Sequence, residues 1–157
     1  MAYLIDGNNL MGQSDPYFKY DLSSRNHLVA RLLIFQKTTR KRIFLVFDGK
    51  PPSDDHLLRL NPKFLVLFPQ PGQSADELIE DLLTQKRDRR YFKVVSSDRG
   101  VREIARAKGA DSISSQEFLK ELKEILKKGR QERELKKEIE DSTPLELSLW
   151  DELLSRK

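Results

Sequence analysis

Short apolar runs alternate with amphipathic runs along most of the chain. The short runs are rich in β-branched and aromatic residues, and turn-forming residues separate them from the amphipathic runs. This pattern is typical of strands buried in an open sheet. The sequence predicts strands at residues 2–5, 42–47, 64–68, 91–95 and 112–113.

Apolar positions at helical spacing fill the gaps between these strands. Ser23 or Ser24 is expected to cap the first helix, in which Leu28, Leu32 and Phe35 form one apolar stripe. A short helical segment is expected around residues 56–60. A further helix is expected to begin at a capping box formed by Ser74 and Glu77. Another is expected at residues 101–108 and ends at Gly109. A last one is expected at residues 118–127, where Ser114 and Glu117 form the cap.

Strands that alternate with helices predict an α/β fold with a doubly wound parallel sheet and right-handed crossovers. If the five strands, numbered along the chain, take the order 3-2-1-4-5, the first strand lies at the centre of the sheet. We expect residues 1–127 to form this domain.

The composition changes in residues 128–157. Nearly every residue from 129 to 142 is charged or polar, which predicts a solvated helix or a linker. Thr143 and Glu146 then form a capping box with Pro144 at the first helical position, and Trp150 lies in the apolar stripe of a short terminal helix. This charged helical tail is expected either to fold back on the domain or to dock on a protein or ribonucleoprotein partner.

Composition narrows the chemistry. The chain has 157 residues, 38% hydrophobic and 34% charged, as expected for one soluble domain. It has no cysteine, which excludes disulfides and thiolate metal sites and suits a reducing cytoplasm. Its two histidines argue against a histidine-rich zinc site. No apolar run approaches the roughly 20 residues of a membrane span, and the first one is too short for a signal peptide. The net charge of +4 permits a polyanionic partner.

Four acids are expected at one edge of the sheet. Asp6, Asp48 and Asp98 directly follow the first, second and fourth strands, and Asp76 begins the helix that leaves the third. Ligands of open parallel sheets bind outside the carboxyl ends of the strands. In the order 3-2-1-4-5, these acids become neighbours there.

Neighbouring carboxylates need compensation. Two like charges about 4 Å apart repel by roughly 4 kcal/mol at an effective dielectric constant of 20, so protons or cations must occupy the site. Oxygen ligands alone suit Mg²⁺ or Mn²⁺, which can activate a water and orient a phosphate. This chemistry is phosphodiester hydrolysis.

Each acid also has a structural alternative. The helix dipole alone favours Asp76, while Asp98 could be a helix N-cap and Asp48 a turn residue. Glu80, one helical turn after Asp76, could support the site or lie on a solvated face. Asp6 is the hardest to explain as a cap, because a long polar segment is expected to separate it from the next helix.

Contacts to RNA are expected beside the same edge. Asn8 and Asn9 could orient Asp6 or a phosphate, or only shape the turn after residue 7. Lys50, Arg99 and Arg102 are the candidate phosphate-binding cations. The aromatic segment 13–20 could stack on unpaired bases or pack against the core. The basic clusters 40–42 and 86–90 precede strands, which places them at the opposite edge as helix C-terminal cations.

Four runs together resemble the NYN domain, specifically the YacP-like branch of the PIN-like nuclease superfamily. They are LIDGNN at 4–9, FDG at 47–49, SADELIEDL at 74–82 and VVSSDRGVREIARAKGA at 94–110, within roughly residues 2–120. The resemblance implies a PIN-like three-layer α/β/α fold and a metal-dependent endoribonuclease that leaves a 5′-phosphate and a 3′-hydroxyl.

The resemblance also assigns residues. The metal-binding acids of the family correspond to Asp6, Asp76 and Asp98 in this chain. The side-chain amide that follows the family's Asp-Gly pair corresponds to Asn9, and the acid at the end of the second strand corresponds to Asp48. Many relatives carry a further acid two residues after the last aspartate, where this chain has a glycine. The site could therefore hold either one metal ion or two.

These observations predict a cytoplasmic, Mg²⁺- or Mn²⁺-dependent endoribonuclease that cuts single-stranded or loop RNA in RNA processing or decay. Asp6, Asp76 and Asp98 would bind the metal, with Asp48 and Asn9 assisting. Two alternatives are a non-catalytic RNA-binding module of a larger complex and a metal-dependent phosphatase.

Overall fold

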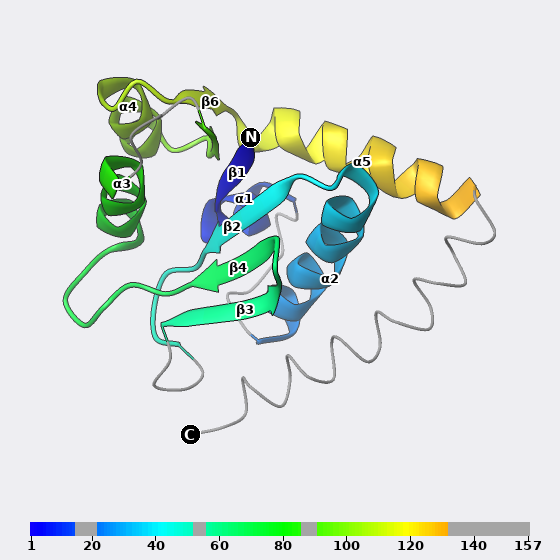
Figure 1. The fold of residues 1–157 in the computed structure, drawn as a ribbon, viewed down its shortest axis with the longest axis horizontal. Coiled ribbons are helices and arrows are strands. Elements are labelled where there is room, and N and C mark those ends of the chain that lie inside the picture. The colour runs from blue at the N-terminus through cyan, green and yellow to red at the C-terminus, as the bar shows by residue number, and fades with distance from the viewer. Residues whose placement is uncertain (15–21, 52–55, 86–90, 132–157) are drawn as a thin grey trace.

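The computed structural model describes residues 1–14, 22–51, 56–85 and 91–131. Within them, six strands form a single sheet in the order β3-β4-β2-β1-β5-β6 (Figure 1). The strands are β1 (Ala2–Asp6), β2 (Arg42–Val46), β3 (Leu57–Asn61), β4 (Phe64–Leu67), β5 (Phe92–Val95) and β6 (Asp111–Ile113).

The five predicted strands are present with the predicted relative order and parallel direction, but the sheet carries a sixth, antiparallel strand at its edge that the predicted order 3-2-1-4-5 lacks. Along the sheet they are β4, β2, β1, β5 and β6, and every neighbouring pair among them is parallel. Ile5 of the central strand pairs with Leu45 on one side and Val95 on the other. All side chains of β1 are buried, as a strand covered on both faces requires.

The helix expected around residues 56–60 is wrong. This segment is β3, which pairs antiparallel with β4 at the edge of the sheet. Leu58 is buried while Leu57 and Arg59 are exposed, so burial alternates as in a strand covered on one face. The run is too short for its leucines to separate a helical period from a strand period. Asn61 then accepts the backbone N–H of Lys63 at 2.8 Å, which closes the hairpin turn.

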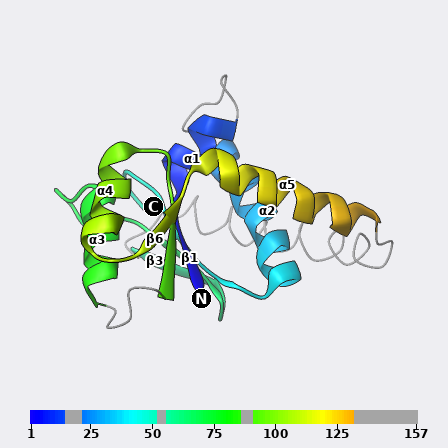
Figure 2. The ribbon, with the colours of Figure 1, turned by 90° about the horizontal axis from the view of Figure 1, so that it is seen from above.

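Helices cover both faces of the sheet, which confirms the three-layer α/β/α arrangement (Figure 2). Helices α1, α2 and α5 pack on one face, where Tyr3, Phe35 and Phe118 contact one another edge to face at 5.2–5.6 Å between ring centroids. Helices α3 and α4 pack on the other face against β1, β2 and β5. The helices are α1 (Gly7–Ser14), α2 (Leu22–Thr39), α3 (Ala75–Gln85), α4 (Arg99–Ala107) and α5 (Ser115–Gln131).

Helix α1 begins directly after Asp6, so the expectation of a long polar segment there is wrong. The carboxylate of Asp6 accepts the backbone N–H of Asn9, as a helix N-cap does. The sequence of α1 hides the helix because two glycines interrupt it, and only Leu10 and Met11 supply buried large side chains. A Cβ at Gly7 would lie 2.9 Å from the Phe47 ring, so glycine is what lets α1 approach the end of β2.

The predicted helix signals are mostly confirmed. Ser74 and Glu77 form the capping box, with the backbone N–H of Glu77 donating to Ser74 Oγ at 3.1 Å. Ser114 caps α5 in the same way, accepting the N–H of Glu117 at 3.1 Å. Helix α2 instead begins at Leu22, so Ser23 and Ser24 lie within its first turn rather than before it.

Three predictions fall outside the described residues, namely the aromatic stacking segment from residue 15 onward, the basic cluster 86–90 and the terminal helix after residue 131. Helix α5 continues to Gln131, past the domain boundary expected at 127. The division into a domain and a tail stays a prediction. Among the helices described, none is both long and apolar enough to span a bilayer.

Candidate active site at the carboxyl edge

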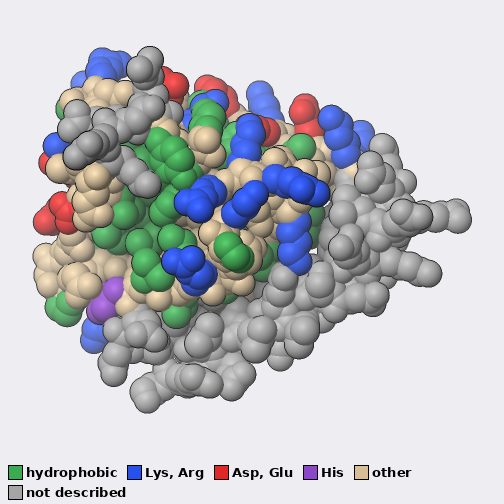
Figure 3. Space-filling model, viewed as in Figure 1, with side chains coloured by type: hydrophobic (Ala, Val, Ile, Leu, Met, Phe, Trp, Pro, Cys, Tyr) green, Lys and Arg blue, Asp and Glu red, His purple; other side chains and the backbone are tan. Residues whose placement is uncertain are grey.

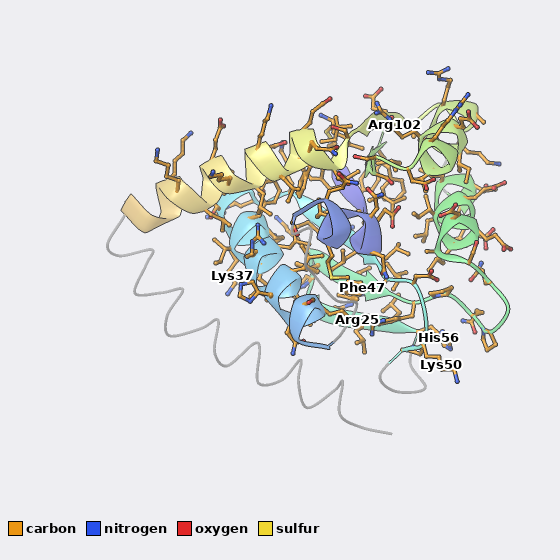
Figure 4. The ribbon with its side chains drawn as sticks, turned by 180° about the vertical axis from the view of Figure 1, so that it is seen from behind. Arg25, Lys37, Phe47, Lys50, His56 and Arg102 are labelled. Carbon is orange, nitrogen blue, oxygen red and sulfur yellow. The ribbon has the colours of Figure 1, made fainter. Side chains whose placement is uncertain are left out.

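The four predicted acids lie along the carboxyl edge of the sheet. Asp6 ends the central strand β1, and Asp48 lies just beyond β2. Asp98 follows β5 and precedes α4, and Asp76 lies in the first turn of α3. Figure 4 views the molecule from the side of α1, the helix that continues from β1 at this edge.

Asp6 is the buried member, with a side chain only 7% exposed. Ser96 Oγ donates a hydrogen bond to Asp6 Oδ2 at 2.9 Å, and the backbone N–H of Asn9 donates another. Burial nevertheless raises the pKa of Asp6 from 3.8 to about 6, and repulsion from Asp76 and Asp98 adds to the increase. Asp6 therefore carries a negative charge that its protein surroundings compensate only in part.

Asp76 and Asp98 face each other across the start of α4. Burial raises the pKa of Asp76, and repulsion from Asp98 and Asp48 raises it further. A Cβ built at Gly100 would lie 3.1 Å from Asp98 Oδ1 and 3.9 Å from Asp76 Oδ2. Position 100 thus borders the space between the two carboxylates, and its glycine leaves that space open.

Asp98 is also the N-cap of α4, which confirms its structural alternative without removing the functional one. Its Oδ1 accepts the backbone N–H of Val101 at 3.1 Å. Its own N–H donates to Ser96 Oγ at 3.1 Å. Ser96 is fully buried and therefore links Asp98 to Asp6 through one hydroxyl group.

No three acids or histidines of the described residues converge tightly enough to form a ready-made metal site. The donor set nevertheless fits a hard divalent cation, because it consists of carboxylate oxygens with too little positive charge around them. Asp98 is exposed and Asp76 half-buried, so both side chains have room to rotate toward an ion. Asp6, Asp76 and Asp98 are the residues that could hold it.

Asp48 lies at the margin of this cluster. Its Oδ1 accepts the backbone N–H of Gly49 at 3.0 Å, the turn interaction expected as its structural alternative. Its backbone N–H donates to Asn8 Oδ1 at 2.9 Å, and its carbonyl oxygen accepts from Arg25 at 3.1 Å. The charge of Asp48 nevertheless repels that of Asp76 and contributes to the raised pKa of Asp76.

Asn9 connects three segments. Its Oδ1 accepts the backbone N–H of Ser97 at 2.8 Å and the hydroxyl of Ser115 at 2.7 Å. The side chain therefore ties α1 to the loop after β5 and to the start of α5, while the backbone of Asn9, rather than its amide group, contacts Asp6. Asn9 therefore holds these three segments together next to the acids.

Sequence reasoning missed two residues of this edge. Ser96 gave a weak signal, as a polar residue directly after a buried strand and two positions before Asp98. Arg25 gave no signal in the sequence, because it lies on a helix far from the four acids along the chain. Its guanidinium stacks over Phe47 at 5.2 Å and over Phe68 at 5.5 Å from the ring centroids (Figure 4).

The predicted RNA-binding cations flank the acids. Lys50 is exposed and lines a hollow of about 550 Å³ beside Asp48. Arg99 and Arg102 line a second hollow of about 710 Å³ between α4 and β6, and Arg99 is also bonded to Glu103 at 3.1 Å. Figure 4 shows Arg102 on the side of α4 that faces the start of α5, and it lines this hollow together with Asp111 and Ser112 of β6.

Other predicted charges lie elsewhere. Figure 3 shows Lys and Arg side chains gathered near the amino ends of β2 and β4, opposite the acids. The described cluster 40–42 belongs to this edge, as predicted, since Arg42 begins β2. Glu77 serves in the capping box, and Glu80 is exposed on α3.

Comparisons with known proteins agree on one family. The family model described as the YacP-like NYN domain matches residues 3–156, so the match also includes the charged tail. The chain is 27% identical over 158 residues to the protein YacP of Bacillus subtilis (strain 168), covering 96% of this chain and 91% of that one. The crystal structure of Rae1 (YacP) from Bacillus subtilis matches with a TM-score of 0.67 and 25% identity, covering 98% of this chain and 90% of that one. The structure of a mutant of the same protein matches with a TM-score of 0.68 and 23% identity, over 94% and 92% of the two chains.

Proposed function

Because the chain belongs to the YacP-like NYN domain family, a branch of the PIN-like nucleases, we propose that it is a metal-dependent endoribonuclease. The observation that carries this proposal is the environment of Asp6. A carboxylate is buried at the end of the central strand, faces two further acids, and has a pKa raised to about 6. A fold gains no stability from such an arrangement, whereas a cation-binding site needs it.

Asp6, Asp76 and Asp98 would hold Mg²⁺ or Mn²⁺. When bound, such an ion lowers the pKa of water and neutralises charge that develops on a phosphate. Ser96 fixes the orientation of Asp6 and the N-terminus of α4 together, since one hydroxyl bonds to both. Asp48 lies close enough to repel Asp76 and would assist as a ligand or as an outer carboxylate.

RNA would cross this edge with its phosphates against the flanking cations Lys50, Arg99 and Arg102. Asn8 would contribute through its NH₂ group, because its Oδ1 already accepts the N–H of Asp48. Water would attack the phosphorus in line and the P–O3′ bond would break, leaving a 5′-phosphate and a 3′-hydroxyl. A role in RNA processing or decay follows from this reaction.

The test is cleavage of an RNA that contains single-stranded loops, with Mg²⁺ or Mn²⁺ and with a chelator. The wild type should cut, the chelator should stop cutting, and Asp6→Asn should lose at least about 100-fold in rate, as expected when a charged group that stabilises the transition state is removed. Glu124→Gln is the matched control, because Glu124 is an exposed acid on α5 that lines neither hollow.

The remaining outcomes identify the alternatives. If the wild type and Asp6→Asn bind this RNA and both leave it intact with Mn²⁺, the protein is a non-catalytic RNA-binding module. If the wild type turns over p-nitrophenyl phosphate without cutting RNA, it is a metal-dependent phosphatase.

A further inference from the structure

A hollow of about 550 Å³ opens next to the acids. Two loops enclose it, residues 48–51 after β2 and residues 69–73 after β4, and His56 completes the wall. Strands β2 and β4 are parallel neighbours, so both loops leave the carboxyl edge of the sheet. Because β2 also neighbours β1, the hollow lies beside the edge where Asp6 ends the central strand.

Hydrogen bonds within the protein fix the walls of this hollow. His56 Nδ1 lies 2.9 Å from the carbonyl oxygen of Pro69, and the backbone N–H of Phe68 donates to the carbonyl of His56 at 2.8 Å. The same loop is closed by the N–H of Gln73 donating to the carbonyl of Gln70 at 2.9 Å. The opposite loop is held by the backbone N–H of Asp48, which donates to Asn8 Oδ1 at 2.9 Å. The hollow is thus formed without a ligand, as binding pockets usually are.

The lining combines apolar surface with a few polar groups. The exposed Lys50 supplies a cation to the lining, and Asp48 supplies a carboxylate. Since a carbonyl can only accept, neutral His56 must carry its proton on Nδ1, which leaves Nε2 as an acceptor. Figure 4 shows His56 and Lys50 on neighbouring parts of this region. The apolar lining comes from Pro51, Pro69 and Pro71.

We propose that this hollow binds one unpaired nucleotide of the RNA strand next to the phosphate that is cut. The base packs against the prolines, His56 Nε2 accepts a hydrogen bond from it, and Lys50 contacts its phosphate. This inference rests on the proposed function and deepens it. A base enclosed in a pocket can be neither stacked nor paired in a duplex, so the pocket selects single-stranded or loop RNA.

The two histidines of the chain provide the test. His27 is exposed on α2 and does not line the hollow, so it serves as an internal control for His56. Proton NMR of the imidazole resonances is recorded while a single-stranded RNA hexanucleotide is added to the full chain in EDTA, which prevents cleavage. The His56 resonances should shift and saturate, and those of His27 should stay unchanged.

Two further arms define the ligand. Inorganic phosphate alone, and a duplex of the same sequence, should leave His56 unchanged. Lys50→Gln should weaken binding of the hexanucleotide and reduce the salt dependence of log K by about 0.7, the value for one phosphate contact on a single strand. Lys63→Gln, at an exposed turn near the opposite edge, should bind as the wild type does.

The result separates this inference from the proposed function. If the protein cuts RNA but His56 does not respond to the hexanucleotide, the pocket proposal is wrong and the nuclease proposal stands. If His56 responds but no RNA is cut with Mn²⁺, the pocket stands and the nuclease proposal is wrong. An equal response to phosphate or to duplex, or no saturable response to any RNA, overturns the pocket proposal.

Discussion

Asp6→Asn should stabilise the metal-free protein while it removes activity. The substitution keeps the shape of the side chain and removes the charge that the fold compensates poorly. One oxygen remains to accept the N–H of Asn9, and the new NH₂ group can donate to Ser96 Oγ. The hydrogen bond between positions 6 and 96 is thereby kept with its direction reversed, since Ser96 Oγ donates in the wild type, and the variant loses the repulsion from the neighbouring acids.

The size of the effect comes from the pKa of Asp6, 3.8 in the unfolded chain and about 6 in the folded protein. This difference corresponds to roughly 3 kcal/mol. Below about pH 4, both states carry the proton and the group has no effect. As pH rises from about 4 to about 6, the unfolded state is ionised while the folded state still holds the proton, so the free energy of unfolding of the wild type falls. Well above pH 6 both states are ionised, and the fall due to this group is complete.

The assay is urea unfolding in EDTA at pH 4 to 8, followed by circular dichroism. Asp6→Asn should exceed the wild type by up to about 3 kcal/mol at pH 8, with the difference disappearing near pH 4. Glu124→Gln, the control on α5, should show no such trend. Adding Mn²⁺ should stabilise the wild type and not the variant, because only the wild type retains the ligand.

A variant less stable than the wild type at pH 8, or a difference between the two proteins that does not change with pH, would contradict this prediction. Either result would mean that the hydrogen bonds of the ionised carboxylate outweigh its burial and the repulsion from its neighbours.

Three further substitutions test the surroundings of the acids. Ser96→Ala should lower the free energy of unfolding by about 1–3 kcal/mol, because it leaves buried polar groups unpaired. The control Ser14→Ala removes an exposed hydroxyl and should have little effect. Urea unfolding measures both variants. Gly7→Ala should cost about 1–3 kcal/mol by pressing a Cβ to 2.9 Å from the aromatic ring beyond β2, and unchanged stability would show that α1 can shift freely. Gly100→Asp adds a carboxylate beside Asp98, so it should destabilise the metal-free protein and increase the stabilisation by Mn²⁺; thermal unfolding with and without the ion tests this, and an unchanged response to Mn²⁺ would refute it.

Much of the fold was accessible from the sequence because its strands are short, apolar and separated by helical periods. This pattern predicted five parallel strands, their order and the layers of helices. It failed at β3 and α1, where few large side chains are buried. In both places packing against the rest of the molecule, rather than local periodicity, decides the structure: β3 pairs with β4, and α1 fits against Phe47 because residue 7 is a glycine.

The candidate site divides in the same way. Sequence alone was enough to predict which acids share one edge, since parallel strands end together wherever their carboxyl ends meet. The surroundings of each acid come from the tertiary fold: Asp6 is buried, Ser96 connects it to Asp98, and Arg25 stacks on Phe47 beside Asp48. Those contacts join residues far apart in the chain, and their pKa consequences depend on distance and burial, which no spacing along the sequence specifies.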